Sequence, residues 1–229
     1  MISTKKSALV LGATGLIGKE LVKILNESEQ YEKIRLLVRR PIDLESAICE
    51  EHIIDFNELH KYTELFQVTD IFCCLGTTIK AAKTKEAFRK VDYDYPVAAA
   101  KLAKENGAEK VLVISSMGAD PKSLFFYSRV KGDLEAALIS LNLPSLHIFR
   151  PSLLLGERSE FRLGEKIAEK SSGVMNKLMI GPLLPYRGIQ ARKVAAAMSF
   201  VAQSKKLGNH VYLSNEIESM IGLSESGKV

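Results

Sequence analysis

The chain has 229 residues, of which 46% are hydrophobic and 26% are charged, and its formal net charge is +5. This length suits one α/β domain whose core is large enough to be stable without disulfides or metals. No apolar run reaches the roughly 18 residues of a membrane-spanning helix, so we expect no membrane partner. The apolar run that follows Lys5 and Lys6 is short and ends in a glycine turn, so we expect no signal peptide. The basic residues are scattered along the chain, which argues against a nucleic-acid partner.

The three cysteines are Cys49, Cys73 and Cys74. An odd number of cysteines, two of them adjacent, is not typical of a disulfide framework, and free thiols fit a reducing compartment. We therefore expect a cytoplasmic protein. The four histidines lie far apart in the sequence without metal-ligand spacing, so we predict no metal site.

Strand-like and helix-like segments alternate along the chain, which predicts an α/β fold with a doubly wound parallel sheet between two layers of helices. The expected strands are 8–11, 34–38, 52–54, 70–74, 110–115, 145–149 and 210–213. The expected helices are 17–26, 83–105, 124–141 and 190–204. Glycines and prolines interrupt this rhythm around 155–192, where we expect a substrate-side insert within a single domain.

The first expected strand ends in a glycine-rich turn, Gly12-Ala13-Thr14-Gly15-Leu16-Ile17-Gly18, and a helix-like segment follows at once. A strand, a glycine turn and a helix N-terminus together hold a dinucleotide pyrophosphate, because the backbone can approach closely and the helix offers free N–H groups. Gly12 would allow the tight turn, Gly15 the approach of phosphate, and Gly18 the packing of helix on strand. The predicted cofactor contacts here are Gly12, Thr14, Gly15, Leu16, Ile17 and Gly18.

The second expected strand ends in Arg39-Arg40, where an NAD-preferring site usually carries an acidic residue for the ribose 2′-hydroxyl. An arginine can instead pair with a 2′-phosphate through a planar, charge-assisted contact. We therefore predict NADP(H) in preference to NAD(H). The alternative is that both arginines are ordinary surface charges.

Three later strand ends supply further candidate cofactor contacts. Asp55-Phe56 could bind an adenine through the carboxylate and flank it with the ring, although Asp55 could equally cap a helix. Leu75-Gly76-Thr77 would admit a ribose at Gly76, and the alternative is a simple turn. Pro151 has no N–H and could line a nicotinamide pocket, or merely end its strand.

The fifth expected strand delivers Ser115 and Ser116 to the carboxyl end of the sheet, where open α/β sheets bind ligands. Tyr127 and Lys131 follow, four residues apart, and share one helix face. An ammonium group beside a phenol lowers the phenol pKa, so Tyr127 could pass a proton to a carbonyl oxygen during hydride transfer. Ser116 would hydrogen-bond that oxygen, and Lys131 would also hold the cofactor ribose. Ser115 and Tyr127 are further predicted cofactor contacts.

Taken together, these motifs resemble the short-chain dehydrogenase/reductase superfamily, most closely its atypical branch of Tat-interacting-protein-like oxidoreductases. The resemblance implies a Rossmann fold, bound NADPH and a Ser/Tyr/Lys active site, with the tyrosine and lysine at Tyr127 and Lys131. It favours Ser116 over Ser115, because the usual serine lies just past the strand. Extended members often carry an Asn where this chain has Asp92. The segments that resemble the family are 12–18, 73–78, 91–95, 115–120, 127–132 and 149–151.

The sequence thus favours an NADP(H)-dependent oxidoreductase acting on a small-molecule carbonyl or alcohol substrate. A second hypothesis is a non-enzymatic NADPH-binding redox sensor that contacts a protein partner, and a homodimer also stays open. Epimerase or dehydratase chemistry on a nucleotide sugar is a weaker third, because the C-terminal part is short for a large substrate domain.

Overall fold

The computed structural model describes residues 5–156 and 187–225. A seven-stranded sheet in the order β3-β2-β1-β4-β5-β6-β9 forms its centre, and all neighbouring strands are parallel. The order reverses between β1 and β4, which creates a crevice at the carboxyl ends of these two strands. The strands are β1 (Lys6–Leu11), β2 (Tyr31–Val38), β3 (Cys49–Ile53), β4 (Asp70–Cys73), β5 (Lys110–Ile114), β6 (Ser145–Arg150) and β9 (Gly208–Leu213).

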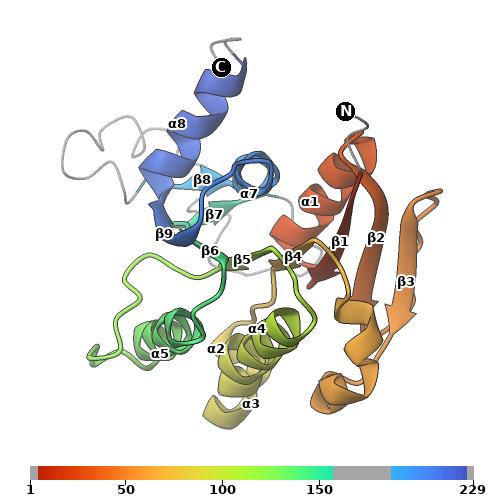
Figure 1. The fold of residues 1–229 in the computed structure, drawn as a ribbon. Coiled ribbons are helices and arrows are strands. Elements are labelled where there is room, and N and C mark those ends of the chain that lie inside the picture. The colour runs from red at the N-terminus through yellow and green to blue at the C-terminus, as the bar shows by residue number, and fades with distance from the viewer. Residues whose placement is uncertain (1–4, 157–186, 226–229) are drawn as a thin grey trace.

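Helices cover both faces of the sheet (Figure 1). One face carries α1 (Leu16–Glu27), α7 (Ala191–Ala202) and α8 (Ser214–Glu225). The other carries the 3-10 segment η1 (Phe56–Phe66), α4 (Tyr95–Glu105) and α5 (Phe126–Ser140). Successive residues of β1 enter opposite cores, with Ala8 and Val10 on the α1 side and Leu9 and Leu11 on the α4 side. The predicted doubly wound, three-layer fold is therefore confirmed.

The expected single helix over 83–105 is wrong. A short helix α2 (Ile79–Ala82) precedes this region, which contains α3 (Lys85–Arg89), a π-helical turn η2 (Lys90–Asp94) and α4. Lys83 ends α2 in a left-handed conformation with φ of 68°, and the Thr84 hydroxyl caps α3 by accepting from the Ala87 N–H. Pro96 has no backbone N–H to donate to the carbonyl oxygen of Asp92, four positions before it. This missing hydrogen bond favours a widened turn ahead of α4.

Other elements differ from their expected bounds or were not expected, because polar strands and short elements give weak apolar patterns in the sequence. The third expected strand, 52–54, belongs to β3 at Cys49–Ile53, an edge strand whose Glu50 and Glu51 are exposed. The segment η1, the helix α8 and a short parallel pair, β7 (Leu154–Leu155) with β8 (Ile189–Gln190), were not expected. Most of the predicted insert, residues 157–186, lies outside the described residues.

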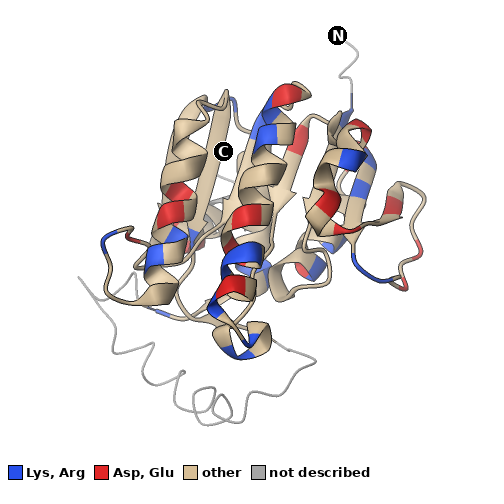
Figure 2. Ribbon diagram, turned by 90° about the horizontal axis from the view of Figure 1, so that it is seen from below, with Lys and Arg blue, Asp and Glu red and all other residues tan. Residues whose placement is uncertain are grey.

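Charges of both signs are interspersed over the helices on the α4 and α5 face (Figure 2). Neither sign forms a continuous band across the helices in this view, in keeping with the scattered basic residues of the sequence. Within residues 5–156 and 187–225, no helix combines the length and apolar character needed to cross a membrane.

Candidate functional site at the carboxyl edge of the sheet

The glycine turn between β1 and α1 is as tight as its sequence predicts. Gly12 has φ of +82°, and a Cβ there would lie 2.6 Å from the Cys74 carbonyl oxygen. A Cβ on Gly18 would overlap the Gly12 carbonyl oxygen, so this glycine lets α1 pack directly on the turn. The Gly15 N–H donates to the Gly12 oxygen at 3.0 Å. Both ends of the turn therefore require glycine for packing within the protein itself.

The middle of the turn faces outward. Thr14 and Gly15 are exposed, Leu16 is half-buried, and Ile17 packs in the core. Gly15 is the N-cap of α1, and the first turn of this helix has neither a side-chain cap nor an acidic residue. The N–H groups and positive dipole end at this terminus form the geometry that suits an anionic group.

Arg39 and Arg40 lie just past the carboxyl end of β2, and both side chains are exposed. Arg39 is close enough to Tyr95 to act on it electrostatically. Burial raises the pKa of the Tyr95 phenol, with a further increase from the charge of Asp55, whereas the positive charge of Arg39 opposes the rise. These residues bring the ends of β2 and β3 together with the start of α4.

Asp55 and Phe56 take the geometry of a helix start. Asp55 Oδ1 accepts from the backbone N–H and the side-chain amide of Asn57, at 2.9 and 2.8 Å, and so caps η1. Phe56 is buried with its ring 5.5 Å from the Tyr95 ring. This arrangement corresponds to the capping alternative for Asp55, and the predicted adenine contact stays a prediction.

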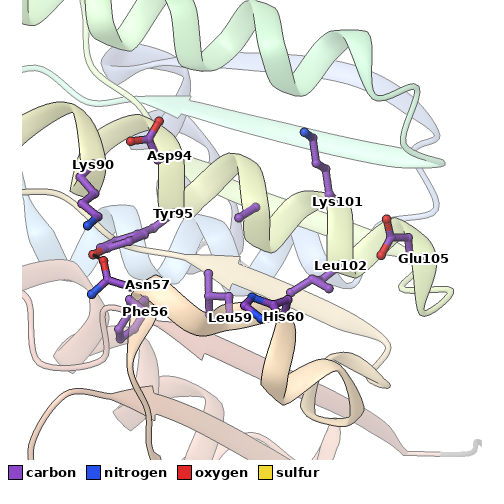
Figure 3. Close-up of a pocket in the computed structure, with 11 residues that line it drawn as sticks. Phe56, Asn57, Leu59, His60, Lys90, Asp94, Tyr95, Lys101, Leu102 and Glu105 are labelled. Atoms are coloured by element: carbon purple, nitrogen blue, oxygen red, sulfur yellow. Dashed lines mark hydrogen bonds between the residues drawn. The ribbon is translucent and has the colours of Figure 1, made fainter. Parts of the chain in front are cut away.

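A cavity of about 460 Å³ lies between η1 and α4 (Figure 3). Phe56 and His60 line it from η1, Lys90 from η2, and Tyr95 and Lys101 from α4. Tyr95 donates its hydroxyl hydrogen to Asn57 Oδ1 at 2.8 Å on one wall. None of Ser116, Tyr127 and Lys131 lines this cavity, so it is separate from the predicted catalytic residues.

The loop after β4 contacts the π-helical turn directly. The Thr77 backbone N–H donates to Asp92 Oδ2 at 2.8 Å. Leu75 packs against the α4-side core, and a Cβ on Gly76 would lie 3.6 Å from Asp92 Oδ1. The predicted cofactor residues 75–77 are therefore held in place by a buried carboxylate from η2.

Asp92 also pairs with Lys131. Lys131 Nζ lies 2.8 Å from Asp92 Oδ1, and the side chains are only 3% and 1% exposed. Burial acts to lower the pKa of Lys131, but the negative charge of Asp92 and the neighbouring Tyr127 phenol outweigh it, so the net shift is upward. Lys131 is thus a fixed, charged group near Cys73 at the carboxyl end of β4.

Tyr127 lies in the first turn of α5 and is 37% exposed, whereas Lys131 one turn later is buried. The Tyr127 ring packs against the buried ring of Phe88 from α3, with centroids 5.6 Å apart. This contact holds the ring, while the exposed fraction leaves the residue accessible to a small molecule. The predicted tyrosine and lysine therefore lie together on one helix face.

The two serines have different environments. Ser115 is buried, and its hydroxyl donates to Glu135 Oε1 at 2.5 Å. Arg150 donates to the same Glu135 carboxylate through Nε and Nη2. Ser116 is half-buried, and its hydroxyl donates to the Met117 carbonyl at 2.9 Å. Ser115 is thus part of an internal network, and Ser116 is the more accessible of the two hydroxyls.

The end of β6 supports this loop. The Pro151 carbonyl oxygen accepts from the Met117 N–H at 3.0 Å, which ties the residues after β5 to those after β6. Glu135 and Arg150 are not among the expected site residues, and Asp92 stands where the resembled pattern has an Asn. Their sequence neighbours give no sign of these roles, because each partner lies on a distant strand, loop or helix. Within the part of the chain that the structure describes, no group of three or more potential metal ligands comes together.

Known proteins resemble this chain in sequence over most of its length. The HIM1 family profile matches residues 24–182. The protein named HTATIP2 from Rattus norvegicus is 40% identical over 172 residues, which cover 73% of this chain and 71% of that protein. A Candida albicans protein named "Protein FMP52, mitochondrial" is 37% identical over 169 residues, which cover 71% of this chain and 74% of that protein.

A solved structure with the same fold is WbmH from Bordetella bronchiseptica, described as a complex with NAD+. Its TM-score is 0.71 at 12% identity, and the match covers 99% of this chain and 83% of WbmH. At this identity the likeness concerns the fold alone.

The expected cytoplasmic location is wrong in light of these relatives. The proteins from Candida albicans, Scheffersomyces stipitis and Debaryomyces hansenii are all named mitochondrial. Three free cysteines fit any reducing compartment, so they do not indicate which compartment holds the protein. The extent of the family match and the identity to HTATIP2 show that this chain belongs to the HIM1 family.

Proposed function

We propose that this protein is an NADP(H)-dependent oxidoreductase that transfers hydride to or from a small carbonyl or alcohol substrate. The observation that carries this proposal is the convergence of three features at one edge of the sheet. These are the outward-facing turn at Gly15, the buried ammonium of Lys131 and the accessible phenol of Tyr127. Ligands of open α/β sheets bind at this edge.

The chain's own groups account for the proton side of the reaction, and NADP(H) would supply the hydride when bound. Tyr127 donates its hydroxyl proton to the carbonyl oxygen that gains negative charge during reduction. Lys131 supports this step, because a nearby cation favours the ionised phenol that is left behind. Ser116 hydrogen-bonds the same oxygen and fixes the orientation of the substrate. In the alcohol-oxidising direction each proton movement is reversed.

The cofactor preference rests on Arg39 and Arg40. Their side chains are exposed past the carboxyl end of β2, where the resembled superfamily places the adenosine ribose. A guanidinium group there would favour the 2′-phosphate of NADPH over the hydroxyl of NADH. The α1 terminus, which lacks an acidic residue in its first turn, would bind the pyrophosphate.

A fluorescence titration with NADPH and NADH tests the cofactor proposal first. We expect tighter binding of NADPH by the wild type and a loss of about tenfold or more of that preference in Arg39→Ala. Arg192→Ala is the matched control, because Arg192 is an exposed arginine on α7. Equal affinity for the two cofactors, or a preference that Arg39→Ala leaves unchanged, would contradict the assignment.

The catalytic step is tested with Tyr127→Phe in a screen of small aldehydes and ketones with NADPH. Loss of a positioned general acid lowers turnover by about 10²–10⁴-fold. NADPH binding should persist, because the phenol hydroxyl acts on the substrate. Unchanged turnover would reject Tyr127 as the proton donor. Tight NADPH binding by a wild type that reduces no carbonyl would favour the redox-sensor hypothesis.

A further inference from the structure

Asp92 occupies an unusual position between two elements of the candidate site. It lies in the π-helical turn η2 and is 1% exposed. Its two carboxylate oxygens face different partners. Oδ1 pairs with Lys131 Nζ of α5 at 2.8 Å, and Oδ2 accepts from the Thr77 backbone N–H of the loop after β4 at 2.8 Å. One buried carboxylate therefore joins the predicted catalytic lysine to the predicted cofactor loop.

Both of these neighbours are hydrogen-bond donors, and this decides which side chain fits between them. A carboxylate presents an acceptor on each side, whereas an asparagine amide presents one acceptor and one donor. An asparagine here would point its NH₂ group either at the Lys131 ammonium or at the Thr77 N–H. In either orientation a buried donor would lose its partner.

We propose that Asp92 is a positioning residue that keeps Lys131 in its charged form and fixes it to the backbone of the loop after β4. This inference rests on the proposed oxidoreductase function for its consequence, because Lys131 acts on Tyr127 in that reaction. The arrangement itself stands on the two contacts and on the burial of both side chains.

The surroundings of Lys131 explain why it needs such a partner. An isolated ammonium loses its hydration when buried and tends towards the neutral amine. The groups that act on Lys131 are Asp92 from η2, Tyr127 from its own helix and Cys73 from β4. Burial raises the pKa of the Cys73 thiol to about 11, so this group is neutral near pH 7. Asp92 is therefore the one carboxylate among these three neighbours, and it holds the ammonium charge.

The inference is tested by NMR on the whole protein with lysine labelled with ¹³C at Cε, whose chemical shift reports the protonation of Nζ. The Lys131 signal is assigned by its absence in Lys131→Met. We expect Asp92→Asn to lower the pKa of Lys131 by at least about one unit, because the charge that offsets burial is lost. Asp94→Asn is the matched control, because it removes the same charge from an exposed position in the same turn.

A Lys131 pKa that is the same in Asp92→Asn and Asp94→Asn would overturn the inference. Should Asp92→Asn fail to fold, the wild type still decides. A Lys131 signal that titrates below its ordinary pKa in the wild type would mean that Asp92 does not hold the charge, whereas one that titrates above it supports the proposal. These measurements need neither cofactor nor substrate, so their failure is distinguishable from failure of the proposed function.

A kinetic readout then links the inference to the reaction. In the carbonyl reduction assay, loss of the Lys131 charge at lower pH should move the alkaline limb of the kcat/KM profile of Asp92→Asn to lower pH. A merely structural role would lower the rate equally at every pH. An unshifted profile in a folded, active variant would contradict the proposed link between Asp92 and the reaction.

Discussion

The two edges of the sheet each contain a buried aspartate paired with a lysine, but the two pairs differ in how completely they are matched. At the carboxyl edge, each oxygen of Asp92 has its own donor. At the amino edge, Asp70 Oδ2 accepts from both the Tyr31 hydroxyl and Lys6 Nζ, at 2.7 and 3.2 Å. Asp70 Oδ1 has no hydrogen-bond partner among the residues that the structure describes.

The lysines differ in the same way. Lys6 is 22% exposed at its side chain and also donates to the Ala202 carbonyl at 2.7 Å, whereas Lys131 is 3% exposed. Lys6 thus keeps both water and a backbone acceptor if Asp70 is lost. Burial of Lys131 without Asp92 would leave the ammonium inside the protein. The amino edge should therefore tolerate the loss of its carboxylate better than the carboxyl edge does.

The largest expected effect comes from breaking each pair in turn. Asp92→Ala should lower the free energy of unfolding at pH 7 by about 3–5 kcal/mol, because it leaves a buried charge unpaired. Asp70→Ala should cost less, about 1–3 kcal/mol, because Lys6 retains solvent and the Ala202 oxygen. Urea denaturation of both variants checks the difference. An Asp70→Ala that is less stable than Asp92→Ala would reverse the interpretation of the two edges.

The sequence was sufficient for the fold because the parallel strands are buried on both faces and leave apolar runs. Every residue of β4 and β5 is buried, and both strands were expected close to their actual positions. The glycine turn was equally predictable. A side chain at Gly18 would clash with the turn itself, and one at Gly12 would clash with the end of the neighbouring strand. Such local and steric requirements are visible in a single sequence.

The partners of the buried charged residues could not be predicted from the sequence. Asp92 lies in a π-helical turn that replaces part of an expected continuous helix, and its partners are 15 residues before it at Thr77 and on α5 at Lys131. Likewise, Glu135 joins Ser115 to Arg150 only because α5 crosses the ends of β5 and β6. Spacing along the chain predicts which residues share a helix face, but not which distant element meets that face.

A second prediction concerns the response of the amino edge to acid. His147 on β6 is fully buried, and burial together with the charges of His210, Lys110 and Lys206 lowers its pKa to about 4. Ser145 Oγ donates to the Lys206 carbonyl, so it accepts from His147 Nε2 at 2.8 Å, and the neutral ring is satisfied. Between about pH 6.5 and pH 4 the unfolded chain therefore binds a proton that the folded chain does not.

Stability should accordingly fall as the pH drops through this window, by about 3 kcal/mol at most from His147. Urea midpoints measured across the window check this, and His147→Phe should show a shallower loss than the wild type. His60→Phe is the control, because the side chain of His60 is 72% exposed. Burial raises the pKa of Asp70, so protonation of Asp70 in acid favours the folded chain and opposes the effect of His147. Both variants keep Asp70, so its contribution cancels when the stability of His147→Phe is compared with that of His60→Phe.

The smallest expected effect separates the two serines at the carboxyl edge. Ser115→Ala removes one hydrogen bond to Glu135, which keeps its contacts with Arg150, so the cost should be about 1 kcal/mol of stability with little change in turnover. Ser116→Ala should leave stability within about 0.5 kcal/mol, because its half-buried hydroxyl donates only to the adjacent Met117 carbonyl. Its turnover should nevertheless fall, since this hydroxyl orients the substrate oxygen in the proposed reaction. Thermal unfolding and the carbonyl reduction assay on both variants check the pair. The opposite pattern, in which Ser115→Ala loses turnover and Ser116→Ala keeps it, would move the substrate-binding hydroxyl to the buried serine and would require the Glu135 network to open during the reaction.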